Sequence, residues 1–116
     1  MHVTVFTPHV LGTAIIPNAA SASAPVLIGD GNSVFALYNS STTATAFVEI
    51  STTPNNTDTG RSAIIPTGTA AGTRGSFPVP PLSLIRIRPG YGRYHWVSVI
   101  ATAADGNTYV TPGDGF

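Results

Sequence analysis

A chain of 116 residues with 42% hydrophobic and only 9% charged residues has room for one small domain with one modest core. The five basic and five acidic side chains cancel, which argues against a duplex-DNA-binding surface, because such a surface needs several cations to displace counterions from phosphates. Cysteine is absent, which excludes disulfides, thiolate zinc sites and cysteine nucleophiles. A surface with so little charge does little to oppose association, so we expect copies of the chain or a partner to cover much of it.

The N-terminal segment, MHVTVFTPHVLG, lacks the basic stretch that opens a secretory signal. No apolar run approaches the roughly 20 residues that a membrane-spanning helix needs. We therefore expect a chain that is made in the cytoplasm and has no membrane partner. Residues 1–116 are predicted to form a single domain, with residues 1–12 as a candidate N-terminal arm.

Ten prolines and twelve glycines divide the sequence into short pieces that are rich in β-branched and aromatic residues. Such pieces favour strands, because their stiff or flat side chains suit a pleated surface. In chain order, the predicted strands are His2–Thr7, Gly12–Ile16, Pro25–Ile28, Ser33–Asn39, Ala44–Ser51, Ser62–Ile65, Ser76–Val79, Leu82–Arg88, Tyr94–Ala103 and Thr108–Thr111.

Two of these strands alternate clearly between apolar and polar residues. In Ala44–Ile50 the apolar face carries Ala46, Val48 and Ile50, and in Ile85–Arg88 the isoleucines alternate with arginines. The segment Arg93–Asp105 also contains an apolar stripe of helical spacing. We prefer a strand there, because its β-branched residues are stiff at χ1 and a turn signal follows.

Turn signals separate the strands. Asn39–Thr43 and Asp105-Gly106-Asn107 are each predicted to close a hairpin, while Thr52–Gly60 and Pro66–Gly75 are predicted to be long loops. Many short strands with frequent turns predict an all-β fold, a single small antiparallel β-sandwich or jelly-roll-like domain.

The sequence contains no pattern that is typical of an active site. His2 and His9 do not match a metal-ligand spacing, and no GxSxG motif is present. Four of the five acids lie in turn-like or terminal segments, where a carboxylate usually bonds to backbone. The Asp-Gly turns offer hard oxygen ligands for calcium, but too few of them, which favours an ordinary turn. We therefore expect no enzyme activity, no catalytic residue, no metal site and no cofactor.

The segment Arg86–Trp96 (RIRPGYGRYHW) concentrates arginines and aromatic residues, the residue types that dominate interface hot spots. Two interpretations remain open: a partner-binding hairpin, or a hairpin whose aromatic residues cover the end of the core. The candidate partner-binding residues are Arg86, Arg88, Tyr91, Arg93, Tyr94 and Trp96.

The low charge, the abundance of Ala, Thr, Ser and Gly, and the lone β-domain resemble the small auxiliary proteins of tailed bacteriophage particles. Phe35–Asn39 (FALYN) and Pro80–Arg86 (PPLSLIR) have the character of such β-sandwich modules. The resemblance implies a virion protein, a head decoration or cement protein that binds the major capsid protein lattice and stabilises the head. It also implies a homo-oligomer, a dimer or a trimer at symmetry positions of the lattice.

Two alternative functions remain open at this stage. One is a carbohydrate- or receptor-binding module of a tail or fibre, with the aromatic residues of Tyr91–Trp96 as its platform. The other is a tail or neck connector subunit, in which a ring of copies buries the uncharged faces.

Overall fold

The structure, a computed structural model, describes residues 6–8, 12–30, 34–67, 76–89 and 93–114. These residues form strands and no helix, which confirms the all-β prediction. The strands are β1 (Thr7–Pro8), β2 (Ala14–Pro17), β3 (Val26–Asp30), β4 (Val34–Asn39), β5 (Ala46–Thr53), β6 (Phe77–Val79), β7 (Leu84–Ile87), β8 (Tyr94–Ala101) and β9 (Asn107–Asp114).

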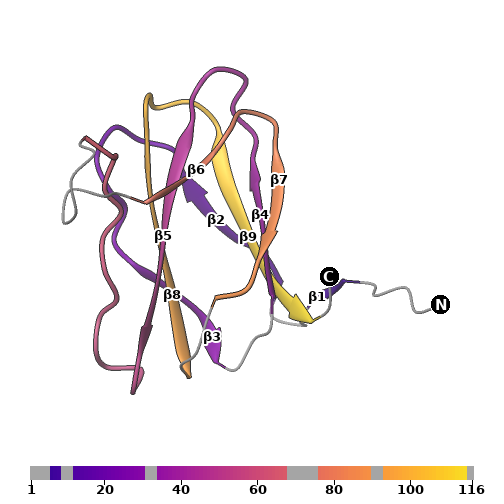
Figure 1. The fold of residues 1–116 in the computed structure, drawn as a ribbon, viewed down its shortest axis with the longest axis vertical. Coiled ribbons are helices and arrows are strands. Elements are labelled where there is room, and N and C mark those ends of the chain that lie inside the picture. The colour runs from indigo at the N-terminus through magenta and orange to yellow at the C-terminus, as the bar shows by residue number, and fades with distance from the viewer. Residues whose placement is uncertain (1–5, 9–11, 31–33, 68–75, 90–92, 115–116) are drawn as a thin grey trace.

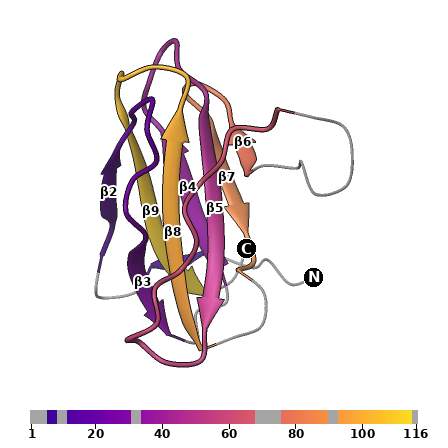
Figure 2. The ribbon, with the colours of Figure 1, turned by 90° about the vertical axis from the view of Figure 1, so that its left-hand side faces the viewer.

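The strands make two antiparallel sheets that pack as a sandwich (Figures 1 and 2). In the first, sheet A, β9 lies between β4 and the short strands β1 and β2, and β7 forms the other edge. Sheet B has the order β3-β8-β5-β6. The pairings are nested, β2 with β9, β3 with β8, β4 with β7 and β5 with β6. A long antiparallel ribbon rolled into two sheets in this way is the jelly-roll arrangement.

The predicted hairpins are wrong. The turn after β4 leads to β5 in the opposite sheet, and the turn after β8 likewise leads to β9 in the opposite sheet. A turn signal marks a reversal of the chain but does not say which sheet receives the next strand. The two turns pack together instead: the Ser40 amide donates to the Asn107 carbonyl at 2.9 Å, and the Asn107 amide donates to Ser40 Oγ at 3.0 Å.

The predicted strand Ser62–Ile65 is also wrong, because this segment is extended but belongs to neither sheet. Its backbone amides bond to serine side chains: Ala63 donates to Ser98 Oγ at 2.9 Å, and Ile64 donates to Ser76 Oγ at 3.0 Å. Residues 60–65, here called the strap, therefore lie across the outer face of sheet B, in front of β8 and β5 in Figure 2.

At the N-terminus, part of the predicted strand His2–Thr7 and of the predicted arm lies outside the described residues. Thr7 and Pro8 form β1, which pairs with Asp114 and Gly113 at the end of β9. β9 therefore continues past Pro112, whereas the sequence predicted a strand that ends at Thr111. Pro112 pairs with Phe35 of β4 on one side; on the other side it falls between the stretch paired with β2 and the stretch paired with β1, where a missing N–H breaks no ladder bond.

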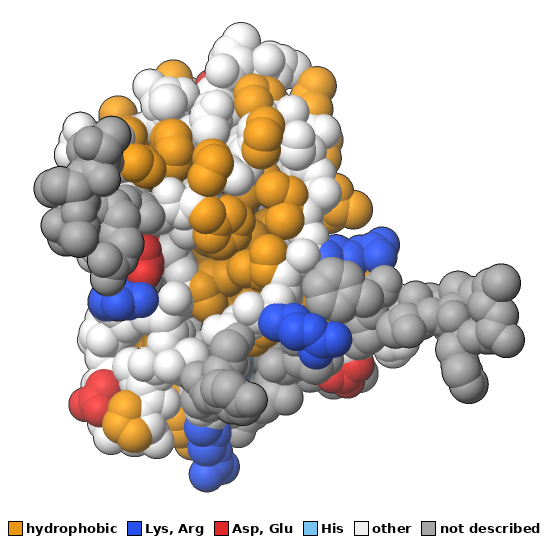
Figure 3. Space-filling view, in the orientation of Figure 1, with side chains coloured by type: hydrophobic (Ala, Val, Ile, Leu, Met, Phe, Trp, Pro, Cys, Tyr) orange, Lys and Arg blue, Asp and Glu red, His pale blue; other side chains and the backbone are white. Residues whose placement is uncertain are grey.

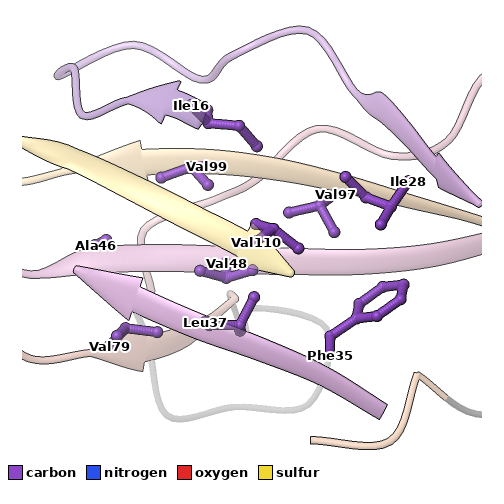
Figure 4. Close-up of a cluster of buried hydrophobic side chains, with 10 residues drawn as sticks. All are labelled: Ile16, Ile28, Phe35, Leu37, Ala46, Val48, Val79, Val97, Val99 and Val110. Atoms are coloured by element: carbon purple, nitrogen blue, oxygen red, sulfur yellow. The ribbon is translucent and has the colours of Figure 1, made fainter. Parts of the chain in front are cut away.

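The core lies between the sheets and consists of inward-facing aliphatic side chains with one aromatic ring (Figure 4). The predicted alternation in β5 is confirmed, since Ala46 and Val48 are buried and Ile50 packs against them. Ile85 and Ile87 of β7 also pack against the core, and Arg86 and Arg88 are exposed. The buried cluster is Ile16, Ile28, Phe35, Leu37, Ala46, Val48, Val79, Val97, Val99 and Val110.

One end of the sandwich is closed by a buried amide network. Asn39, fully buried at the end of β4, donates from Nδ2 to the carbonyls of Ala44 at 2.8 Å and Val79 at 3.0 Å. Its Oδ1 accepts from Asn18 Nδ2 and from the Ser41 amide, both at 3.0 Å. These bonds join sheet A to sheet B. An apolar side chain in place of Asn39 would leave the two buried carbonyls without a donor.

Replacing Asn39 by alanine is expected to destabilise the protein by about 3 kcal/mol, because two buried carbonyls lose their donor at roughly 1–3 kcal/mol each. Chemical denaturation measures the loss. Asn56→Ala, in the exposed loop after β5, is the matched control and should change stability by less than about 0.5 kcal/mol. An Asn39→Ala variant as stable as the control contradicts the role given to this network.

Replacing Gly60 by alanine is expected to displace the strap. A Cβ at this position meets Ser51 Oγ and lies 2.5 Å from Trp96 Cβ, which real Cβ atoms do not tolerate. Trp96 is the single tryptophan of the chain, so its fluorescence should shift to the red as solvent reaches the ring. Thr59→Ala, at an exposed neighbouring position, should leave the emission unchanged.

Candidate functional site

The candidate partner-binding residues do not form a hairpin. β7 lies in sheet A and β8 in sheet B, so the segment Arg86–Trp96 crosses from one sheet to the other. Tyr91 lies outside the described residues. Arg86 is exposed on β7, with its guanidinium 5.8 Å from the ring centre of Phe6. The structure therefore divides the candidates between two sheets.

Of the members of this set at β8, Trp96 lies against the strap. Arg93 places its guanidinium 5.3 Å from the ring centre of Tyr94. Trp96 is half-buried, donates from Nε1 to Thr53 Oγ1 at 2.8 Å, and has Gly60 of the strap against it. This environment agrees with the interpretation in which the tryptophan covers part of the domain.

A cleft of about 380 Å³ opens at the edge of the sandwich between β6 and β7. Apolar side chains gather along this edge in Figure 3. Arg88, one of the candidates, lines the cleft together with Val48, Ile50, Phe77 and Ile87. The cleft is therefore an extension of the core that reaches the surface, with Glu49 and Ser76 as polar groups in its lining.

The outer faces of the two sheets differ. On sheet B the strap is fixed by Arg61, whose amide donates to Ser51 Oγ at 2.9 Å and whose guanidinium meets the Glu49 carboxylate at 2.8 Å. Residues 19–23 continue along the edge of β8 beyond β3: the Ser23 amide donates to the Val99 carbonyl at 2.9 Å. The strap thus covers part of the outer face of sheet B.

The outer face of sheet A carries a continuous row of large side chains across four strands. The register places Ile15 of β2 beside Tyr109 of β9, Tyr109 beside Tyr38 of β4, and Tyr38 beside Leu84 of β7. Ile15 is 61% exposed and Leu84 is 59% exposed, while the two tyrosine rings lie 6.2 Å apart between them. The next register row along the strands contains Thr111, Ala36 and Arg86, so this described part of the face carries very little charge.

Sequence reasoning did not find this row. Its residues lie on four strands that are far apart in the chain, and no short motif connects them. The one local signal was in FALYN, where Phe35 and Leu37 alternate with Ala36 and Tyr38. That alternation shows which side chains of this strand face outward, but it does not show which strands lie beside it.

The sequence offered two interpretations of the turn at Asp105, a calcium ligand or an ordinary turn. In the structure, the Asp105 side chain bonds to the turn after β4. Its carboxylate accepts from Ser41 Oγ at 2.5 Å and from Thr43 Oγ1 at 3.2 Å. These bonds stabilise the ionised form and lower the pKa of Asp105 below its ordinary value of 3.8. Among the described residues, no group of three or more His, Cys, Asp or Glu side chains is placed to hold a metal ion.

Comparison with known proteins leaves the function open. A scan of family models, a search of curated proteins and a search of solved structures each give no match to this chain. Within the part of the chain that the structure describes, there is also no helix with the length and hydropathy to span a membrane.

Replacing Asp105 by asparagine is expected to lower the midpoint of thermal unfolding at pH 7. The folded-state pKa lies below the unfolded value near 3.8, so the stabilisation is complete above that value and disappears as the pH falls through the folded pKa. The difference between wild type and Asp105→Asn should therefore shrink below pH 3.8. Asp58→Asn, in the exposed loop after β5, is the control; a constant difference at every pH contradicts the assignment.

Proposed function

We propose that this protein is a structural subunit of a bacteriophage virion, a head decoration protein that binds the major capsid protein lattice. The observation that carries the proposal is the outer face of sheet A, where Ile15, Tyr38, Leu84 and Tyr109 form an uncharged row whose ends, Ile15 and Leu84, are 61% and 59% exposed. Aromatic and large apolar residues with little charge are the composition of interface cores.

Two further observations support this proposal. The jelly roll is a recurrent fold of viral capsid domains, which favours a virion on fold-level analogy. The composition agrees with a protein that works inside an assembly, because 9% charged residues and zero net charge do little to keep free copies apart. Two of the six candidate partner-binding residues are proposed to contact the lattice. They are Arg86, which is exposed on β7, and Arg88, which is exposed just after it.

The test is the protein content of purified phage particles. Mass spectrometry of gradient-purified virions should find this chain at a fixed ratio to the major capsid protein, and added protein should rebind particles from which it was removed. Arg88→Ala should weaken rebinding. Arg61→Ala is the control and should not, because Arg61 pairs with Glu49 on the outer side of sheet B. Absence of the chain from purified particles contradicts the proposal.

A further inference from the structure

We infer that Asp105 is a site of spontaneous covalent modification, conversion to isoaspartate through its peptide bond with Gly106, and that contacts with the rest of the fold slow this reaction. Aspartate followed by glycine is the sequence at which the reaction is fastest, because glycine has no side chain to shield the attacking nitrogen. The chain has this sequence at Asp30-Gly31, Asp105-Gly106 and Asp114-Gly115. Asp105-Gly106 is the pair of which the structure describes both residues. The chemistry is independent of the proposed function.

The reaction needs nothing but the chain and water. The backbone nitrogen of Gly106 attacks Cγ of the protonated Asp105 side chain. The N–Cγ bond forms, the Cγ–O bond breaks, and the hydroxyl leaves with the amide proton as water. Water then opens the resulting succinimide ring. When it cleaves the bond between the nitrogen and the original backbone carbonyl, the main chain continues through Cγ as isoaspartate and is longer by a methylene group.

The fold requires both residues of this reactive pair. Gly106 has a φ of 72°, in the left-handed region, and a Cβ there would lie 2.7 Å from the backbone nitrogen of Ser41. Asp105 supplies the carboxylate that accepts from the hydroxyls of Ser41 and Thr43. Both residues of the pair are exposed, so water reaches them. The turn between β8 and β9 therefore cannot avoid the reactive sequence, and its contacts have to slow the reaction instead.

One set of contacts fixes the carboxylate. Ser41 Oγ at 2.5 Å and Thr43 Oγ1 at 3.2 Å both donate to Oδ2 of Asp105. These bonds have to break before Cγ can approach the nitrogen of Gly106. They also favour the ionised carboxylate and lower the pKa of Asp105, and the ionised form has no hydroxyl to lose. The bonded carboxylate is therefore a poor target for the attacking nitrogen.

A second set of contacts fixes the peptide group that contains the attacking nitrogen. The carbonyl of Asp105 belongs to the same peptide group as the nitrogen of Gly106, and it accepts from Asn18 Nδ2 at 2.9 Å. The carbonyl of Gly106 accepts from the Asn18 amide at 3.1 Å. Asn18 is buried and bonded to Asn39. Ring closure rotates this peptide group, so the closed end of the sandwich has to open locally before the ring can form.

Isomerisation would in turn damage the closed end. The Asn107 carbonyl accepts from the Ser40 amide at 2.9 Å, and the Asn107 amide donates to Ser40 Oγ at 3.0 Å. These bonds depend on the length of the backbone between β8 and β9, which isoaspartate at position 105 increases. A modified chain therefore cannot restore the same set of contacts, and the modified molecules should unfold at a lower temperature than the unmodified ones.

Peptide mapping by mass spectrometry on the full chain tests the inference. Native protein and protein unfolded in guanidinium chloride are incubated side by side at neutral pH for several weeks, and fragment spectra that distinguish isoaspartate from aspartate follow Asp105. The unfolded chain gives the intrinsic rate. Asp105 in the native protein should isomerise about tenfold more slowly or less, because hydrogen bonds to a charged group have to break first. Equal rates in the two samples would overturn the inference.

Variants of the two donors show whether the contacts with Asp105 slow the reaction. Ser41→Ala and Thr43→Val each remove a hydroxyl that donates to the carboxylate, and each should raise the native rate about threefold or more. Thr42→Val is the matched control, because Thr42 bonds to the carboxylate through its backbone amide, which the substitution keeps. Folded donor variants that isomerise no faster than Thr42→Val would contradict the inference.

The fluorescence of Trp96 checks that each variant stays folded during the incubation. Ser41 Oγ also accepts from the amides of Thr43 and Ala44, so Ser41→Ala loses more than its bond to Asp105. Thr43 is exposed, and Thr43→Val keeps the test decisive if Ser41→Ala does not fold. In that case a folded Thr43→Val variant with the wild-type rate at Asp105 is the result that would refute the inference.

Discussion

The carboxamide of Asn39 is the group on which the closed end of the sandwich depends. It donates to the carbonyls of Ala44 and Val79 and accepts from Asn18 and Ser41, so one buried side chain joins the chain after β2, the β4–β5 turn and the end of β6. Asn18 extends the network to the β8–β9 turn through the Asp105 carbonyl at 2.9 Å and accepts from the Thr108 hydroxyl at 2.8 Å. Because buried carbonyls without donors cost free energy, these segments are stable only together, and the alternation of strands between the sheets is fixed at this end.

Polar but uncharged side chains make the surface contacts that charged residues make in most small domains. The strap is held over sheet B mainly by serine hydroxyls on β5 and β8 and by Ser76, with the pair between Arg61 and Glu49 at its edge. Ser98 both accepts from the Ala63 amide and donates to the Ser23 carbonyl at 2.8 Å, so one hydroxyl holds both the strap and the segment along the edge of β8. A chain without lysine can therefore cover one sheet with its own backbone, because short hydroxyl side chains satisfy backbone groups at close range.

This covering makes the two faces of the domain unequal, and the proposed function follows from that inequality. The strap lies over part of the outer face of sheet B, whereas the row on sheet A ends in Ile15 and Leu84, which are 61% and 59% exposed, with the half-buried Tyr38 and Tyr109 between them. The cleft between β6 and β7 continues the core to the surface at the adjoining edge. A row of large apolar side chains that is exposed on one face is typical of a surface that binds a partner.

The sequence by itself determined the all-β class, the inward face of β5 and β7, and the positions of most turns. Each of these follows from local chemistry: alternation with period 2, stiff β-branched side chains, and Gly or Asn at reversals. Only the tertiary structure decided which strands pair. The predicted hairpins after Asn39 and at Asp105 cross between sheets, Ser62–Ile65 bonds to side chains instead of a strand, and Arg86–Trp96 is divided between sheets. The row on sheet A was beyond sequence reasoning for the same reason, since Ile15, Tyr38, Leu84 and Tyr109 become neighbours only through a register set by long-range pairing.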